Sequence, residues 1–168
     1  AALEAGEWYR LLSGHWVHLD WPHACMNMAG LWLLAAVDTE NPTVRICMLR
    51  SLTLSLAVGL MLYGAEPDLY WYVGLSGVLH GLFVIVLLRS AFLRRDRLAL
   101  FVVIVLIGKL AWEHYHGALT QGMLAAPVIV SAHSVGALAG LVYAAVSCLV
   151  TRHFARHPDS KFSCKPRE

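Results

Sequence analysis

Two side chains of this sequence, Ser76 and His133, lie within long apolar stretches and have the chemistry of a nucleophile and a base. A serine hydroxyl attacks a carbonyl when a neighbouring base removes its proton, and neutral histidine can do this near pH 7. His23 and Asn27, in another apolar stretch, could donate hydrogen bonds to the oxyanion that such an attack creates. Because we expect no Asp or Glu close to His133, these residues predict a Ser–His dyad rather than a triad.

Each of these residues alone has a simpler interpretation. The motif Gly74-Leu75-Ser76-Gly77 is also typical of contacts between membrane helices, where small residues are common. His133 could be a buried donor between two helices, and His23 and Asn27 could hydrogen-bond neighbouring helices in the same way. Only a common location of all four residues would favour catalysis.

The composition indicates that membrane-spanning helices carry these residues. Of the 168 residues, 58% are hydrophobic and 14% are charged, against about 45–50% and about 25% in soluble domains. Apolar stretches of roughly 17–25 residues, enough to cross a hydrocarbon core of about 30 Å, recur along the chain. We expect an all-α polytopic membrane helix bundle with five transmembrane helices, at Pro22–Val37, Val44–Tyr63, Leu75–Leu93, Leu98–Trp112 and Val128–Val150.

The charges predict which ends of these helices face the cytoplasm. All Lys and Arg residues except Arg10 and Lys109 lie at or after the ends of the first, third and fifth stretches, and the positive-inside rule makes these ends cytoplasmic. We therefore expect a single membrane domain over residues 1–168, with an outer loop at 1–21, five helices within 22–150 and a basic cytoplasmic tail at 151–168. A chain that begins outside should follow another span, so we also expect a further N-terminal helix.

This topology places the polar residues at a similar depth. The first, third and fifth helices all run inward from the outer face, so Asn27, Ser76 and His133 fall in their outer halves. His23 shares a helix face with Asn27, and His80 follows Ser76 by one turn, about 5.4 Å deeper. This convergence on the outer side favours the catalytic interpretation over the simpler ones.

Glycines at helical spacing predict close contact between the third and fifth helices. Gly136 and Gly140 share a face with His133, and the third helix contains Gly77 and Gly81. Small residues at such spacing let two membrane helices approach closely. The serine and the histidine could then come within hydrogen-bonding distance.

The fourth stretch carries two charges, Lys109 and Glu113, one helical turn apart. Lysine can extend its apolar stem so that the ammonium reaches the membrane surface. We therefore expect Lys109 to place its charge at the membrane surface and Glu113 to lie at the interface. The two side chains should form at most a modest structural pair.

At these residues the sequence resembles the rhomboid proteases. The resemblance covers nearly the whole chain, with the motifs in family order: Trp8-Tyr9-Arg10 followed by His18, His23 and Asn27, then Gly74-x-Ser76-Gly77, then Ala132-His133-x-x-Gly136-x-x-x-Gly140. The family has a six-helix core, so the resemblance also implies that its first helix is missing from this sequence.

The resemblance implies a role for each matched residue. These roles are nucleophile for Ser76, base for His133, oxyanion ligands for His23 and Asn27, a structural histidine of the outer loop for His18 and an anchor of that loop for Arg10. The sequence departs from the family at His80, where an aromatic residue often stacks on the catalytic imidazole. An imidazole can also stack there or hydrogen-bond the base, so we expect His80 to support catalysis.

Residues 17–23 and 74–81 are similar in particular to the rhombosortase branch of the family. That branch is associated with bacterial secreted proteins that carry a C-terminal Gly-Gly, a hydrophobic helix and a basic tail. The resemblance implies protein sorting by a serine endopeptidase of the bacterial inner membrane, with its active site on the periplasmic side and its C-terminus in the cytoplasm. We expect transmembrane protein substrates and the lipid bilayer as partners, and no cofactor, metal or nucleic acid.

Two other classes of function remain open. A catalytically inactive rhomboid-like protein that binds membrane helices would be expected to lack the serine or the histidine, and both are present. A small transporter or metal-binding channel would more naturally have acidic ligands or broken helices near the midplane. The sequence shows neither clearly.

Overall fold

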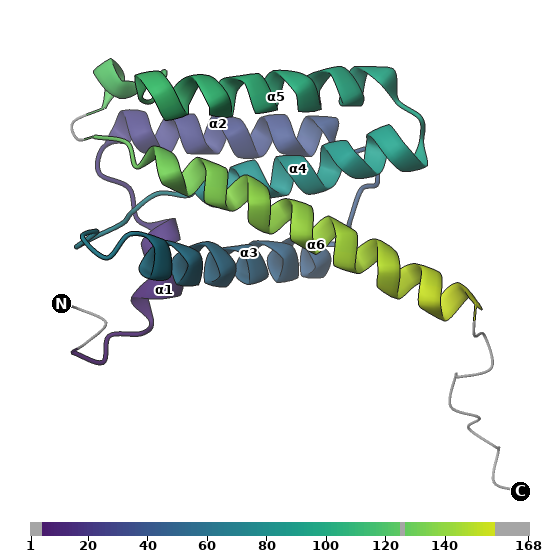
Figure 1. Cartoon of the computed structure of the whole chain (residues 1–168), viewed down its shortest axis with the longest axis horizontal. Helices are drawn as coiled ribbons and strands as arrows, with labels where there is room; N and C mark the ends of the chain where they lie inside the picture. Colours follow the sequence, from purple (N-terminus) through teal and green to yellow (C-terminus); the bar gives the residue numbers. More distant parts are fainter. Residues whose placement is uncertain (1–4, 125–126, 157–168) are drawn as a thin grey trace, which may run out of the picture.

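The computed structural model describes residues 5–124 and 127–156 of the chain. Its elements in chain order are α1 (Arg10–Ser13), η1 (Gly14–Trp16), α2 (Trp21–Val37), α3 (Val44–Ala65), α4 (Ser76–Leu93), α5 (Arg97–His116), η2 (Gln121–Met123) and α6 (Val130–Arg156). No strand occurs in these described residues, which confirms the predicted all-α bundle (Figure 1). Helices α3, α4, α5 and α6 are long and apolar enough to cross a membrane. Helix α2 has 17 residues, and its crossing stays a prediction.

The helices begin and end close to the predicted stretches, with extensions at their polar ends. Helix α5 continues to His116 and α6 to Arg156, because helical hydrogen bonding does not require apolar side chains. At the other ends, Asp20 accepts a hydrogen bond from the backbone N–H of His23 at 2.7 Å, and Asp96 accepts from two backbone N–H groups of α5. Such caps satisfy N–H groups that have no partner inside the helix.

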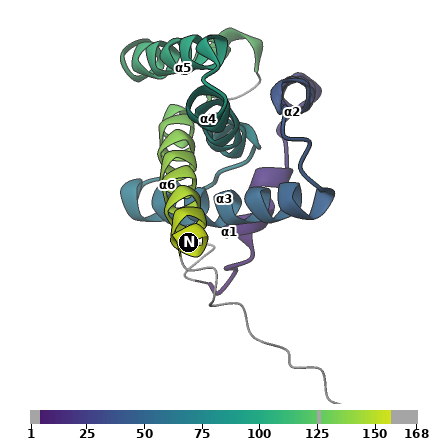
Figure 2. The same ribbon diagram turned by 90° about the vertical axis from the view of Figure 1, so that its right-hand side faces the viewer.

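Helix α4 forms the centre of the bundle. It packs against α2, α3, α5 and α6, and most extensively against α6 (Figure 2). The core joins α4 to α3 and α6 through fully buried side chains, among them Leu54, Val58, Val78, Ile85 and Ala132. Since Ser76 is the first residue of α4, this core fixes the position of its backbone.

Two pairs of glycines bring α4 and α6 into backbone contact. A Cβ added at Gly81 would lie 2.7 Å from the carbonyl oxygen of Gly136, and one added at Gly136 would lie 2.6 Å from the carbonyl carbon of Gly77. A Cβ added at Gly140 would lie 2.7 Å from the Cα atom of Gly81. Any larger residue at these positions must push the helices apart, so the glycines set the α4–α6 distance near Ser76.

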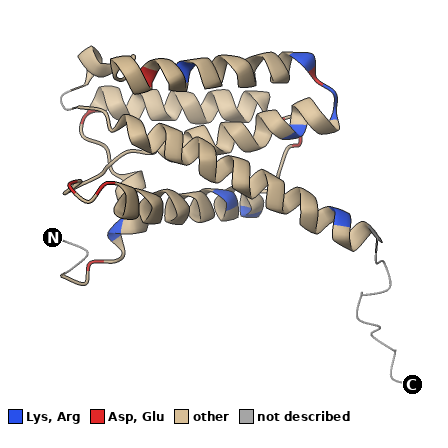
Figure 3. Cartoon of the chain, in the orientation of Figure 1, with Lys and Arg blue, Asp and Glu red and all other residues tan. Residues whose placement is uncertain are grey.

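Among the described residues, most Lys and Arg side chains gather at the end of the bundle opposite to the start of α4, the helix that begins at Ser76 (Figure 3). There Arg50 lies 3.7 Å from carboxylate oxygens of both Asp38 and Glu40, and Arg89 Nε donates to both oxygens of Glu40 at 2.9 Å. These ion pairs attach the α2–α3 loop to α3 and α4. The distribution of charge agrees with the topology that the sequence predicts, and the assignment of this end to the cytoplasm stays a prediction.

Candidate active site

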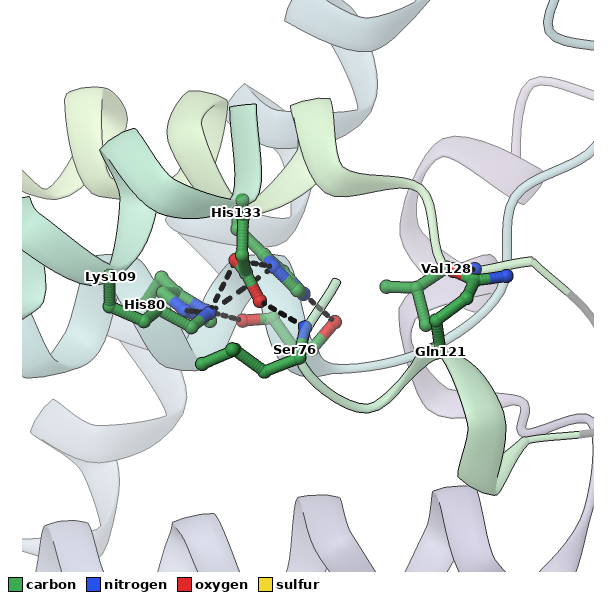
Figure 4. Close-up of polar contacts among 8 residues, drawn as sticks. Ser76, His80, Lys109, Gln121, Val128 and His133 are labelled. Atoms are coloured by element: carbon green, nitrogen blue, oxygen red, sulfur yellow. Dashed lines mark hydrogen bonds and ion pairs between the residues drawn. The ribbon is translucent and has the colours of Figure 1, made fainter. Parts of the chain in front are cut away.

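The structure brings Ser76 and His133 together where α4 meets α6. Ser76 Oγ lies 3.1 Å from His133 Nε2, a hydrogen-bonding distance (Figure 4). His133 lies in the first turn of α6 and is buried, with 5% of its surface exposed. The hydroxyl can therefore donate to the imidazole, which is the geometry that activates a serine.

A carboxylate lies on the far side of the same imidazole, so the prediction that no acid is close to His133 is wrong. Glu113 Oε2 lies 2.9 Å from His133 Nδ1, and Glu113 is only 3% exposed. The expected interfacial acid is instead buried, because α5 packs against both α4 and α6. Since an ionised carboxylate only accepts, His133 Nδ1 carries the proton and its Nε2 can accept from Ser76.

Lys109 joins this acid to a second histidine. Its Nζ lies 2.7 Å from Glu113 Oε2 and 2.6 Å from His80 Nε2. His80 Nδ1 lies 2.7 Å from the carbonyl oxygen of Ser76, which only accepts, so Nδ1 is the donor and Nε2 accepts from the ammonium. Lys109 Nζ also lies 3.4 Å from His133 Nδ1. Both of these nitrogens are donors, so no hydrogen bond forms between them. The expectation that Lys109 extends to the membrane surface is also wrong, because its ammonium has two acceptors inside the bundle.

The ring of His80 stacks on the ring of His133. Their centroids are 4.3 Å apart and their planes differ by 17°. The hydrogen bond from His80 Nδ1 to the carbonyl of Ser76 spans one turn of α4 and holds the ring in this orientation. His80 therefore contacts both the backbone of the candidate nucleophile and the ring of the candidate base.

The segment before α4 has a backbone conformation that directs Ser76 toward the site. Gly74 has a φ of +116°, which favours glycine, and a Cβ there would lie 2.5 Å from the ring of His23. Its N–H donates to the carbonyl of Gly14 at 3.0 Å, and its own carbonyl accepts from the Tyr72 hydroxyl at 2.9 Å. Burial raises the pKa of Tyr72 to about 12, so this hydroxyl remains a donor.

A small cavity of about 20 Å³ lies beside Ser76 and is also lined by His23, Tyr72 and Val128. The backbone N–H of Val128 donates to Gln121 Oε1 at 3.4 Å, which connects η2 to the segment just before α6, near the cavity (Figure 4). About 10–15 Å³ is enough for one water molecule. The cavity therefore has room for a water next to the candidate nucleophile.

Of the predicted residues His23, Asn27, His18 and Arg10, one lines this cavity. His23 lines it, and its Nδ1 is buried without a hydrogen-bond partner among the described residues. Asn27 is buried and does not line the cavity; its Nδ2 donates to the carbonyl of His23 at 3.1 Å. His18 packs its ring against that of His23 at 5.0 Å. Arg10 lies outside the group, where it is exposed and pairs with Glu7 at 2.7 Å.

His80, Glu113 and His133 also have the residue types of a metal site, and their ligand atoms all lie within 4.8 Å of one another. The ammonium of Lys109, however, lies within hydrogen-bonding distance of both His80 and Glu113. It takes the place that a metal cation would occupy, and a divalent ion there would meet a positive charge. We therefore interpret the group as a hydrogen-bonded cluster.

The fold and the site together define a polytopic α-helical membrane protein with a serine and a histidine paired at one end of its bundle. The model of the rhomboid domain matches residues 5–150. The chain therefore belongs to the rhomboid family, whose active members are intramembrane serine proteases and which also has inactive members. No curated protein and no solved structure matches the chain at a significant level. The family resemblance is confirmed, and the assignment to the rhombosortase branch stays a prediction.

Proposed function

We propose that this protein is an intramembrane serine endopeptidase that cleaves membrane-anchored proteins near the outer membrane–water interface. The observation that supports this proposal best is the 3.1 Å distance between Ser76 Oγ and His133 Nε2. An inactive relative has no need of a partly buried serine that donates to a histidine whose other nitrogen is already bonded to an acid. The proposed location is the bacterial inner membrane, with the site on the periplasmic side.

The proposed reaction has two stages. Ser76 Oγ attacks the carbonyl carbon of the scissile peptide while His133 Nε2 takes the hydroxyl proton, and the imidazolium then gives this proton to the leaving amine. A water molecule next attacks the resulting ester and passes a proton to His133, which returns it to Ser76 as the new carboxylic acid leaves. The cavity beside Ser76 has the volume to hold this water.

The negative charge on the tetrahedral oxygen needs donors. Ser76 is the first residue of α4, so its backbone N–H has no partner inside the helix and can serve as one donor. We propose His23 as a second, because its ring lines the cavity with Ser76. The remaining N–H of the Asn27 amide could supply a third if a substrate rearranges the start of α2.

We propose that the substrates are secreted proteins with a C-terminal sorting tail of Gly-Gly, a hydrophobic helix and basic residues. A peptide carbonyl within a helix is hydrogen-bonded and inaccessible to Ser76, so the substrate helix must unwind locally. Glycine near the interface lowers the cost of that unwinding, since it destabilises a helix by roughly 0.5–1 kcal/mol relative to alanine. The assignment of this tail rests on the resemblance of residues 17–23 and 74–81 to the rhombosortase branch.

A reconstituted cleavage assay tests the substrate class. The protein and a fusion protein with such a tail are placed in liposomes, and the product is identified by mass spectrometry. We expect cleavage close to the Gly-Gly, and a rate at least tenfold lower when Gly-Gly is changed to Leu-Leu. A matched control is the same fusion protein with the two glycines intact and only the basic tail shuffled. Equal cleavage of Gly-Gly and Leu-Leu substrates would reject the sorting-tail assignment.

Replacing His80 with Ala should lower the turnover number about tenfold without abolishing activity. The change removes the ring that stacks on His133 and the hydrogen bond to the carbonyl of Ser76, but it leaves the Ser76–His133 contact in place. The initial rate of substrate cleavage measures this, and His80→Phe, which restores an aromatic ring, should retain more activity than His80→Ala. Inactivity as complete as that of Ser76→Ala would show that His80 does more than support the base.

A further inference from the structure

We infer that Glu113 is a positioning residue for His133 and that Lys109 compensates its charge, so that the site operates as a Ser76–His133–Glu113 triad. This inference rests on the proposed function, because it concerns the same site. It adds a third functional group and a partly buried ammonium, both contributed by α5.

The hydrogen-bond distances fit one arrangement of protons. Lys109 donates to Glu113 Oε2 and to His80 Nε2, His133 donates from Nδ1 to Glu113 Oε2, and Ser76 donates to His133 Nε2. A proton on Glu113 Oε2 would face two donors and would break both contacts. The carboxylate is therefore ionised, and it selects the one tautomer of His133 in which Nε2 can act as a base.

Charge in the cluster supports the same role. When His133 takes the proton of Ser76 it becomes an imidazolium, and its Nδ1 lies only 3.4 Å from the ammonium of Lys109. These two positive charges repel each other in a site from which water is largely excluded. Glu113 Oε2 contacts both groups, at 2.7 Å and 2.9 Å, so its negative charge offsets this repulsion as the transition state forms.

Burial explains why the acid and the ammonium occur together. An isolated carboxylate with 3% exposure would be costly, because its charge would lose most of its hydration. Lys109 lies one turn before it in α5, and its side chain is 24% exposed. The backbone N–H of Leu119 approaches the second carboxylate oxygen at 3.4 Å. Both oxygens of Glu113 thus have donors, and the carboxylate is held in a single orientation.

Nitrogen-15 NMR of the histidines tests the inference in the unmodified protein. At neutral pH the signals of His133, assigned by their loss in a His133→Asn variant, should show a protonated Nδ1 and an unprotonated Nε2. The Glu113→Gln variant should show a mixture of tautomers, or the opposite one. A protonated Nε2 in the unmodified protein would overturn the inference, whatever the stability of the variants.

Kinetics of the purified protein supply the second test. Glu113→Gln should lower kcat for a cleaved substrate at least tenfold and leave KM within twofold, because Glu113 acts through His133 and does not touch the substrate. The rate of labelling by a fluorophosphonate probe should fall similarly. Glu113→Asp retains the charge and should recover part of the rate, and Lys109→Met should lower kcat at least threefold. Glu66→Gln, a change of an exposed acid, is the matched control.

The outcomes separate this inference from the proposed function. If the unmodified protein neither cleaves substrates nor reacts with the probe, the proposed function fails. If it reacts through Ser76 but Glu113→Gln has the kcat of the unmodified protein, the proposed function stands and the inference fails. An increase in KM with unchanged kcat would likewise overturn the positioning role.

Discussion

Replacing Ser76 with Ala is expected to abolish both peptide cleavage and covalent labelling by a fluorophosphonate. The probe forms a bond between its phosphorus and the serine oxygen with loss of fluoride, so it requires the hydroxyl that lies 3.1 Å from His133 Nε2. Loss of the nucleophile or the base in a serine protease lowers kcat by about a million-fold. Cleavage by Ser76→Ala and by His133→Ala should therefore fall below detection, as measured by gel fluorescence and product formation.

Ser55→Ala is the matched control for this experiment. Ser55 is fully buried in α3, and its Oγ has no hydrogen-bond partner among the described residues. Removing that hydroxyl should leave labelling and cleavage unchanged. Labelling that persists in both Ser76→Ala and His133→Ala would place the reactive serine elsewhere and would remove the protease assignment.

A methyl group added at Gly136 is expected to lower cleavage about 100-fold while the protein remains folded. The new Cβ would overlap the Gly77 backbone, with only 2.6 Å to its carbonyl carbon, so α6 must move away from α4 and carry His133 with it. A misplacement of about 1 Å in an active site can cost about 100-fold in rate. Overpacking of this kind typically destabilises a core by about 1–3 kcal/mol. The cleavage rate and the thermal unfolding midpoint of Gly136→Ala measure the two effects.

Gly64→Ala distinguishes this effect from a general response to alanine. Gly64 is also helical, but nothing lies within 4 Å of the Cβ that alanine would introduce there. The control should retain full activity and equal or slightly higher stability, since alanine favours helix by up to about 1 kcal/mol over glycine. Unchanged cleavage by Gly136→Ala would mean that the α4–α6 glycine contact does not position His133.

The sequence predicted the fold and the central contact because both depend on patterns that repeat along the chain. Apolar stretches set the helices, and the charges at their ends set a common direction for three of them. Ser76 and His133 then fall at one depth, and the glycines near them indicate which helices touch. The structure places these two residues together at the α4–α6 contact.

Glu113 could have been found by the same reasoning. The fourth stretch runs outward, so Glu113, near its end, lies at the depth of His133. The position of this acid near the end of the stretch predicted an interfacial location instead, because position along one helix does not show that α5 packs against both α4 and α6. Lys109, one turn earlier, was the sequence feature that indicates a buried Glu113, since a buried carboxylate needs a partner of opposite charge.

His15 and Tyr72 illustrate what sequence patterns do not show. His15 is 1% exposed, its ring lies 5.1 Å from that of Tyr72, and burial lowers its pKa. Neither residue lies in a helix that spans the membrane. Their positions depend on how the outer loop folds back onto the segment before α4, and loop packing of this kind has no periodic signal.

The central position of α4 has a consequence for the way the protein would lose activity on heating. Amide hydrogens of α4 should exchange most slowly, because opening that helix requires the whole core to open. Only Ala99 and Glu113 are buried in α5, so this helix should detach at a lower free-energy cost. Detachment of the intact α5 helix from α4 and α6 would withdraw Lys109 and Glu113 while Ser76 and His133 stay in contact. Turnover should then decline in two stages on heating, the first of them before the cooperative melting of the remaining bundle.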